Sequence, residues 1–153
     1  MYLYNVPKVS VRDHYITCVL NKEKNYESGT MNVKLSLDNR DKLKGTKNLL
    51  VRLLDPEGRK VAESEVAVEY APSSPVSVAE VSFDLSGLSL WTAETPSLYT
   101  VQVIQRQGNK DEMAFSTKYG FRDIEVKGSL LYVNGYSLRE RTVTTHIRCM
   151  DGQ

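Results

Sequence analysis

Histidine and cysteine are scarce in this sequence of 153 residues, which has two of each. Cys18 and Cys149 form no Cys-x-x-Cys or Cys/His cluster, which excludes a zinc site of the usual spacing. A disulfide between them is compatible with the sequence but is not implied by it, so the redox compartment stays open. Neither His14 nor His146 has a catalytic motif around it, and no serine lies in a nucleophile elbow.

The sequence also has few glycines, a small net charge and no long apolar run. The nine glycines form neither a phosphate loop nor a dinucleotide fingerprint, and we expect no cofactor and no metal. A net charge of +1 gives no basic excess for binding nucleic acid. Residues 1–8 lack the pattern of a signal peptide, and no apolar run reaches the roughly 18 residues that a membrane helix needs. We therefore expect neither nucleic acid nor a membrane as a partner.

Apolar residues instead recur at every second position, which is the period of a half-buried β-strand. The alternation is clearest at residues 31–37, 66–70, 81–85 and 99–103. Residues 49–54 form a less regular strand, and Asp-Pro-Glu-Gly at 55–58 is a strong turn. About seven short strands without a helical segment predict an all-β, immunoglobulin-like β-sandwich of antiparallel strands. Its predicted core contains Leu35, Val51, Phe83, Trp91, Val101 and Val103.

The two ends of the chain fall outside this sandwich pattern. Residues 1–8 contain a tyrosine-rich strand, Tyr2 to Tyr4, followed by a proline. Residues 124–135 read as a hairpin-like unit that closes on Asn134-Gly135, which is a strong hairpin signal. We therefore expect the sandwich to occupy residues 9–122, with residues 1–8 and 123–153 coming from neighbouring domains.

Three motifs, in a fixed order, carry a resemblance to a known family. Residues 90–99 read LWTAETPSLY, residues 119–126 read YGFRDIEV, and residues 130–135 read LLYVNG. These resemble the patterns LWSAExPNLY, VGFRx[IV]x[IV] and LLx[VL]NG of the β-galactosidases of glycoside hydrolase family 2. The Gly-Phe-Arg favours this branch over the glucuronidases, which usually carry Gly-Ile-Arg. The residues that carry the motifs are Trp91, Glu94, Pro96, Leu98, Tyr99, Gly120, Phe121, Arg122, Asn134 and Gly135.

The resemblance implies a structural role for residues 9–122 as the family's middle domain. Residues 1–8 resemble the end of the sugar-binding jelly roll, and residues 123–153 begin the (β/α)₈ barrel, so these two domains are the implied partners. The family's catalytic glutamates lie in the barrel, which needs about 250 residues, so no catalytic residue is carried onto this chain. The resemblance thus implies a parent enzyme that hydrolyses terminal β-galactosides, and Tyr99 is expected to pack and hydrogen-bond as a corner tyrosine.

Glycosidase chemistry needs two carboxylates roughly 5 to 10 Å apart, and no residues in the sequence indicate such a pair. Glu63 and Glu65 share a strand face, but their neighbours are basic and polar, and we interpret them as solvated charges. Trp91 is an aromatic platform for a sugar in one interpretation and a packing residue in the favoured one. The leading hypothesis is an inactive linker domain. The alternative is a stand-alone module that binds glycans or proteins, with homodimerisation through former domain interfaces as one outcome.

The tail departs from the family after Arg139. Removing one G from a family-type codon string for LRGANRHD yields LRERTVTT, which is the sequence of residues 138–145. We therefore hypothesise a frameshift, with an arbitrary divergent tail as the alternative. The nucleotide sequence beyond codon 153 distinguishes the two.

Overall fold

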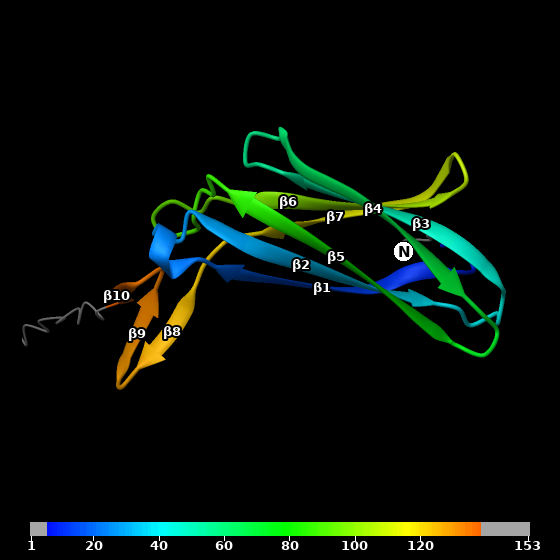
Figure 1. Ribbon diagram of the computed structural model, residues 1–153, viewed down its shortest axis with the longest axis horizontal. Helices are drawn as coiled ribbons and strands as arrows, with labels where there is room; N and C mark the ends of the chain where they lie inside the picture. The colour runs from blue at the N-terminus through cyan, green and yellow to red at the C-terminus, as the bar shows by residue number, and fades with distance from the viewer. Residues whose placement is uncertain (1–5, 139–153) are drawn as a thin grey trace, which may run out of the picture.

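The computed structural model describes residues 6–138, which form ten β-strands and one short 3₁₀ turn (Figure 1). The predicted strand at Tyr2 to Tyr4, His146, Cys149 and the shifted tail therefore lie outside the described residues. The elements are β1 (Ser10–Leu20), η1 (Lys22–Lys24), β2 (Ser28–Asp38), β3 (Gly45–Leu54), β4 (Lys60–Tyr70), β5 (Val76–Ser86), β6 (Tyr99–Gln107), β7 (Lys110–Tyr119), β8 (Ile124–Lys127), β9 (Leu130–Val133) and β10 (Tyr136–Leu138).

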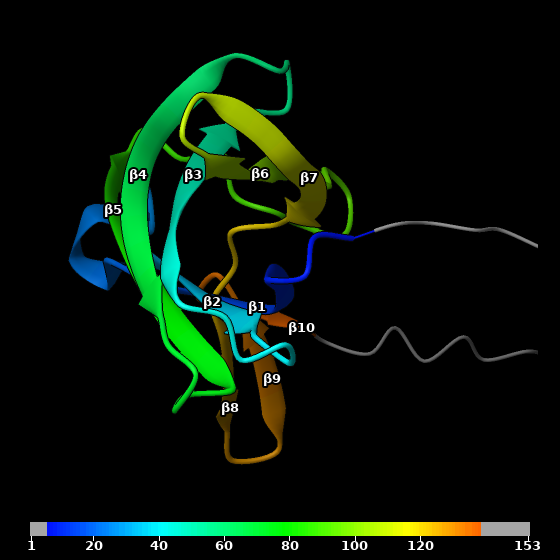
Figure 2. The same cartoon turned by 90° about the vertical axis from the view of Figure 1, so that its right-hand side faces the viewer.

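The first seven strands form two antiparallel sheets, with orders β1-β2-β5 and β4-β3-β6-β7, that pack face to face (Figure 2). In the described part of the chain, β4 pairs with β3, which gives a three-plus-four division of the strands. The predicted seven-stranded, immunoglobulin-like antiparallel sandwich is confirmed.

The core lies between the two sheets and follows the period-two pattern. On β2, Met31, Val33, Leu35 and Leu37 are buried, and their pairing with β5 places Val81 and Phe83 on the same face. Buried residues of β3 and β6 fill the space from the other sheet. Five of the six predicted core residues are buried: Leu35, Val51, Phe83, Val101 and Val103. The prediction is wrong for Trp91, which is only half-buried and lies outside the main core cluster.

A third, three-stranded sheet, β10-β9-β8, projects from one end of the sandwich (Figures 1 and 2). Asn134 and Gly135 both have positive φ, 52° and 81°, and Val133 pairs with Tyr136 across them. These values match a two-residue type I′ turn, so the predicted Asn-Gly hairpin is confirmed. β1 begins at the opposite end of the sandwich and, at about 3.3 Å per residue, spans about 33 Å before it reaches η1 (Figure 1).

Candidate functional site: the junction between the sandwich and the third sheet

Residues of the three family motifs meet where the sandwich ends and the third sheet begins. The backbone N–H of Trp91 donates to the carbonyl of Phe121 at 2.8 Å, which joins the 87–98 loop to the segment after β7. Trp91, Leu98, Gly120 and Arg122, with Ile124 of β8, line a shallow depression of about 510 Å³. The junction is therefore built by segments that are distant in the sequence.

Trp91 is held between a glycine and an arginine. A Cβ atom on Gly120 would lie 2.9 Å from Trp91 Cδ1 and 3.0 Å from its Cβ, so this position admits no side chain without displacing the ring. The Arg122 guanidinium carbon lies 4.7 Å from the ring centroid, in the geometry of a cation–π contact. Arg122 therefore lies over one face of the indole.

Asn134 fastens the third sheet to this junction through its side chain. Its Nδ2 donates to the carbonyl of Trp91 at 3.0 Å, and its Oδ1 accepts from the backbone N–H of Asp123 at 2.9 Å. The backbone N–H of Asn134 also donates to the carbonyl of Asp123 at 2.9 Å. Because Asn134 is buried, these bonds satisfy polar groups of Asn134 that have little access to water.

Phe121 and Tyr99 anchor the junction to the core. Phe121 is fully buried, and its ring packs edge to face against Tyr99 at 4.8 Å and against Tyr119 at 5.2 Å. The hydroxyl of Tyr99 accepts a hydrogen bond from the backbone N–H of Ser89 at 3.0 Å. The expectation that Tyr99 packs and hydrogen-bonds at the start of a late strand is confirmed. Burial raises the pKa of Tyr119 to about 12, so this phenol stays neutral.

The remaining motif residues occupy the rim of the junction. Glu94 lies exposed in the turn between Thr92 and Thr95, where Thr92 Oγ1 accepts from the Thr95 N–H at 2.9 Å. Pro96 is exposed and forms an isolated antiparallel bridge with Trp91. Gly135 lies over Tyr26, whose hydroxyl would be 3.1 Å from an added Cβ. These residues shape the turn that carries Trp91 and the turn of the third sheet.

A charged clamp, formed by Lys22, Asp123, Glu125 and Lys127, joins the turn after β1 to β8. Lys22 Nζ forms ion pairs with Asp123, at 3.2 Å, and with Glu125, while Lys127 Nζ lies 2.8 Å from Glu125. Hydrogen bonds from Lys127 and then Lys22 lower the pKa of Glu125 to about 2. The clamp is exposed to solvent, so its ion pairs add little to the stability of the fold and chiefly orient β8 relative to the turn after β1.

The sequence did not reveal a similar set of buried side-chain hydrogen bonds at the opposite end of the sandwich. Gln105 of β6 is buried, its Oε1 accepts from the Val11 N–H at 3.1 Å, and its Nε2 donates to the Val9 carbonyl at 2.7 Å. Gln105 Nε2 also lies 3.1 Å from Glu112, which pairs with the buried Lys47 at 2.6 Å. The sequence pattern could have indicated that Gln105 is buried, because residue 105 continues the alternation that points Tyr99, Val101 and Val103 into the core.

Burial alone would raise the pKa of Glu112, but the hydrogen bonds from Lys47 and Gln105 outweigh it and lower that pKa. Glu112 is therefore ionised. It fixes the Gln105 side chain in the orientation that bonds to the backbone of the segment entering β1. Each end of the sandwich thus carries a buried polar side chain that holds a connecting segment: Gln105 at the entry and Asn134 at the exit.

The structure gives no support for a catalytic role of the two glutamates that the sequence offered as candidates. Glu63 and Glu65 are exposed on β4, and Glu63 is paired with Arg52 and Lys60, in agreement with their interpretation as solvated charges. His14 packs against Phe115 at 5.3 Å. Residues 6–138 contain no cluster of three His, Cys, Asp or Glu side chains that could hold a metal ion. Cys18 is half-buried, and burial raises the pKa of its thiol to about 11.

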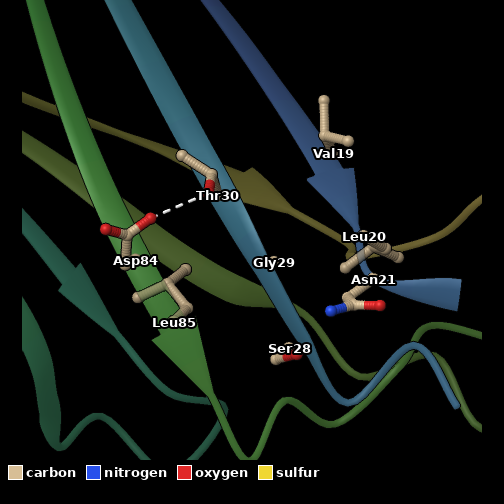
Figure 3. Close-up of a pocket in the computed structure, with 8 residues that line it drawn as sticks. All are labelled: Val19, Leu20, Asn21, Ser28, Gly29, Thr30, Asp84 and Leu85. Atoms are coloured by element: carbon tan, nitrogen blue, oxygen red, sulfur yellow. Dashed lines mark hydrogen bonds between the residues drawn. The ribbon is translucent and has the colours of Figure 1, made fainter. Parts of the chain in front are cut away.

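A second depression, of about 400 Å³, lies where β1 and β5 end and β2 begins (Figure 3). Its lining residues contribute one carboxylate, Asp84, which accepts a hydrogen bond from the Thr30 hydroxyl at 2.7 Å. A single, engaged carboxylate cannot supply both the acid and the nucleophile of glycoside hydrolysis. In the region that the structure describes, no helix is long and apolar enough to cross a membrane.

Comparison with known proteins gives a consistent result. The profile of Glycosyl hydrolases family 2 matches residues 9–122. The β-galactosidase of Priestia megaterium is 28% identical over 149 residues, which are 95% of this chain and 14% of that protein. The β-galactosidase of Clostridium acetobutylicum is 28% identical over 150 residues, or 95% and 15%. The chain therefore spans about one seventh of the length of these curated relatives.

Solved structures share the fold. A glycosyl hydrolase family 2 member from Bacteroides cellulosilyticus DSM 14838 aligns over 87% of this chain and 18% of its own, with a TM-score of 0.76 and 19% identity. The β-glucuronidase of Parabacteroides merdae aligns over 86% and 16%, with a TM-score of 0.71 and 22% identity. At these identities the likeness concerns the fold alone.

Proposed function

Because this chain belongs to glycosyl hydrolase family 2, we propose that it serves as the structural spacer domain of a β-galactosidase and is itself inactive. The galactosidase branch is supported by the curated relatives and by the Gly120-Phe121-Arg122 motif. The fold does not separate the branches, since a β-glucuronidase shares it. The domains that the spacer would connect are the jelly roll before it and the barrel after it.

One observation carries the proposal: the connecting segments enter and leave at opposite ends of the sandwich, and a buried amide side chain holds each of them. Gln105 bonds to Val9 and Val11 at the entry, and Asn134 bonds to Trp91 and Asp123 at the exit. Between these points lies a closed apolar core. A domain built in this way fixes the distance and orientation between its neighbours, which is what a spacer must do.

The glycan-binding alternative receives less support from the junction. A sugar ring stacks on an open aromatic face, whereas Arg122 lies over one face of Trp91 and Gly120 contacts the same side chain. The depression beside Trp91 is lined by Lys118 and Arg122 but by no carboxylate or amide side chain that would bind sugar hydroxyls in the usual way.

We expect the purified chain to give no turnover of a chromogenic β-galactoside above the rate of buffer alone. The physical reason is that carboxylates that share a depression in residues 6–138 are held by cations instead of being free to act as acid and nucleophile. Asp38 and Asp41 pair with Arg12 and Lys8. Asp111 and Glu112 pair with Arg106 and Lys47. The matched control is the same preparation after thermal unfolding. Hydrolysis that copurifies with the folded chain and disappears on unfolding would contradict the proposed inactivity.

A further inference from the structure

β1 lies at the edge of the three-stranded sheet, and within residues 6–138 no strand pairs with its outer side. On the other side of the sandwich, the edge strands β4 and β5 lie against each other, so each shields the other (Figure 2). An edge strand presents a row of backbone N–H and C=O groups to which another strand can bond. The outer edge of β1 is therefore a place where a further strand can be added.

The last seven residues of β1 lack the features with which proteins usually protect an edge. Residues 14–20 read HYITCVL and contain no Asp, Glu, Lys, Arg, Pro or Gly. The bulge of β1 lies before them, between Val11 and Asp13. The edge strand β7, by contrast, carries four charged side chains. Uncharged segments of this length that are rich in β-branched and aromatic residues are those that pair most readily with another strand.

The side chains of this segment alternate between the core and the solvent. Ile16 and Cys18 lie opposite buried residues of β2, so they face the core. Tyr15, Thr17 and Val19 therefore point to the outer face of the sheet. Tyr15 is 67% exposed and Val19 is 72% exposed. The edge thus combines unprotected backbone with large side chains that are left in water.

The segment fits a second copy of itself in one antiparallel register. When a two-fold axis relates two antiparallel strands, the numbers of opposite residues add to a constant. That sum must be even, because only then do the backbone groups that face the partner strand lie opposite each other. A sum of 34 is the even value that places residues 14–20 of one copy opposite residues 14–20 of the other. This register keeps every Asp, Glu, Lys and Arg side chain out of the ladder.

The pairs that this register forms are favourable ones. Thr17 lies opposite Thr17 of the second copy, and Tyr15 lies opposite Val19 on either side of the axis. Threonine pairs and pairs of an aromatic with a β-branched residue are among the cross-strand neighbours that stabilise sheets. Beyond each end of the ladder, the exposed Asp13 of one copy comes near the exposed Lys22 of the other. Opposite charges therefore flank the uncharged ladder at both ends.

We propose that two copies of this chain associate through β1, in an antiparallel ladder of residues 14–20 centred on Thr17. The two three-stranded sheets then become one continuous sheet. The inference is independent of the spacer function, because it concerns the edge of a strand and not the two ends of the sandwich that connect to other domains. A seven-residue ladder buries less than the roughly 800 Å² per partner of a standard interface, so the dissociation constant should be on the order of 50 µM.

Sedimentation equilibrium of the whole chain in reducing buffer, from about 5 to about 500 µM, measures this association. We expect monomers at the low concentrations and dimers at the high ones. Thr17→Lys places two like charges directly opposite each other at the axis and should weaken dimerisation by at least about tenfold. Val78→Lys is the matched control, since Val78 is 49% exposed on the outer face of β5, and it should change the dissociation constant by less than about twofold. Both variants should unfold within about 2 °C of the parent chain.

A mixture of variants tests the register itself. Thr17→Glu alone should be as monomeric as Thr17→Lys, whereas an equal mixture of the two should dimerise at least as tightly as the parent, because residue 17 faces residue 17 of the other copy. A dimer that Thr17→Lys leaves intact, or a mixture that stays monomeric, would overturn the proposal.

A parent chain that remains a monomer at about 500 µM would also overturn the proposal. Slow hydrogen exchange along residues 14–20 in that monomer would assign the edge to another segment of the same chain. Sedimentation to large aggregates without a dimer would show that the edge pairs in an open-ended way, which contradicts a closed ladder about a two-fold axis.

Discussion

Replacing Phe121 with alanine should lower the free energy of unfolding by about 3–5 kcal/mol, the usual cost of deleting a buried aromatic ring. Phe121 is fully buried, and its ring contacts those of Tyr99 and Tyr119, so the vacated volume has no flexible neighbour to fill it. Urea denaturation measures the effect as a shift of the midpoint at constant slope. The backbone carbonyl of residue 121, which accepts from the Trp91 N–H, is retained in the variant, so the loss measures the packing of the ring.

Phe115→Ala is the matched control for this experiment. Phe115 lies on β7 and is only partly buried, with His14 as its aromatic neighbour, so its loss leaves a site that water can enter. We expect its destabilisation to be less than half that of Phe121→Ala. Equal losses for the two variants would contradict the view that Phe121 anchors the sandwich at the junction.

Replacing Gln105 with leucine should destabilise the chain by about 2–4 kcal/mol, although leucine has a similar volume and is more apolar. The reason is that the Val11 N–H and the Val9 carbonyl would lose their partner at a buried site, and an unsatisfied buried group costs about 1–3 kcal/mol. Thermal or urea unfolding measures this loss. Hydrogen exchange should show that the Val11 amide loses protection before the amides of β2 do.

Gln102→Leu provides the comparison on the same strand, because residue 102 points to the opposite face of β6. We expect its effect to stay within about 0.5 kcal/mol, as is usual for a surface substitution. If the Gln105 and Gln102 variants were equally stable, the entry segment would not depend on the buried amide.

The sequence predicted the sandwich because its strands obey a simple period. The alternation at Met31 to Leu37 and at Tyr99 to Val103 decides which side chains face the core, and the structure buries them accordingly. The turn at Asn134-Gly135 was equally predictable from the sequence. Its two central residues both have positive φ, and Asn-Gly is one of the few residue pairs that favour this conformation. These features depend on local chemistry, which a single sequence contains.

The interpretation of Trp91 as a core residue was wrong because it ignored Gly120 and Arg122, which stand some thirty residues later in the chain. Nothing near Trp91 in the sequence indicates that a guanidinium will lie over its ring. Asn134 was recognised as a turn residue, but its side-chain bonds to Trp91 and Asp123 depend on the tertiary structure.

The third sheet shows a different limit of sequence reasoning. Alternation at Ile124 and Val126 reveals that these side chains share a face, but it does not reveal which way that face points. Lys22, far away in the sequence, pairs with Asp123 and Glu125 and so places this side of β8 beside the turn after β1. A periodic pattern predicts which side chains share a face, and only the structure shows what each face contacts.

Rigidity between the entry and the exit of the sandwich is the central claim, and a distance distribution measures it most directly. Spin labels at Lys8→Cys and Ser129→Cys, in a Cys18→Ala and Cys149→Ser background, lie at the two exposed ends. Pulsed dipolar EPR should give one narrow distance peak, and Lys22→Ala should broaden it by releasing β8 from the charged clamp. A broad distribution in the chain with Lys22 intact would contradict the account, since a flexible connection cannot act as a spacer.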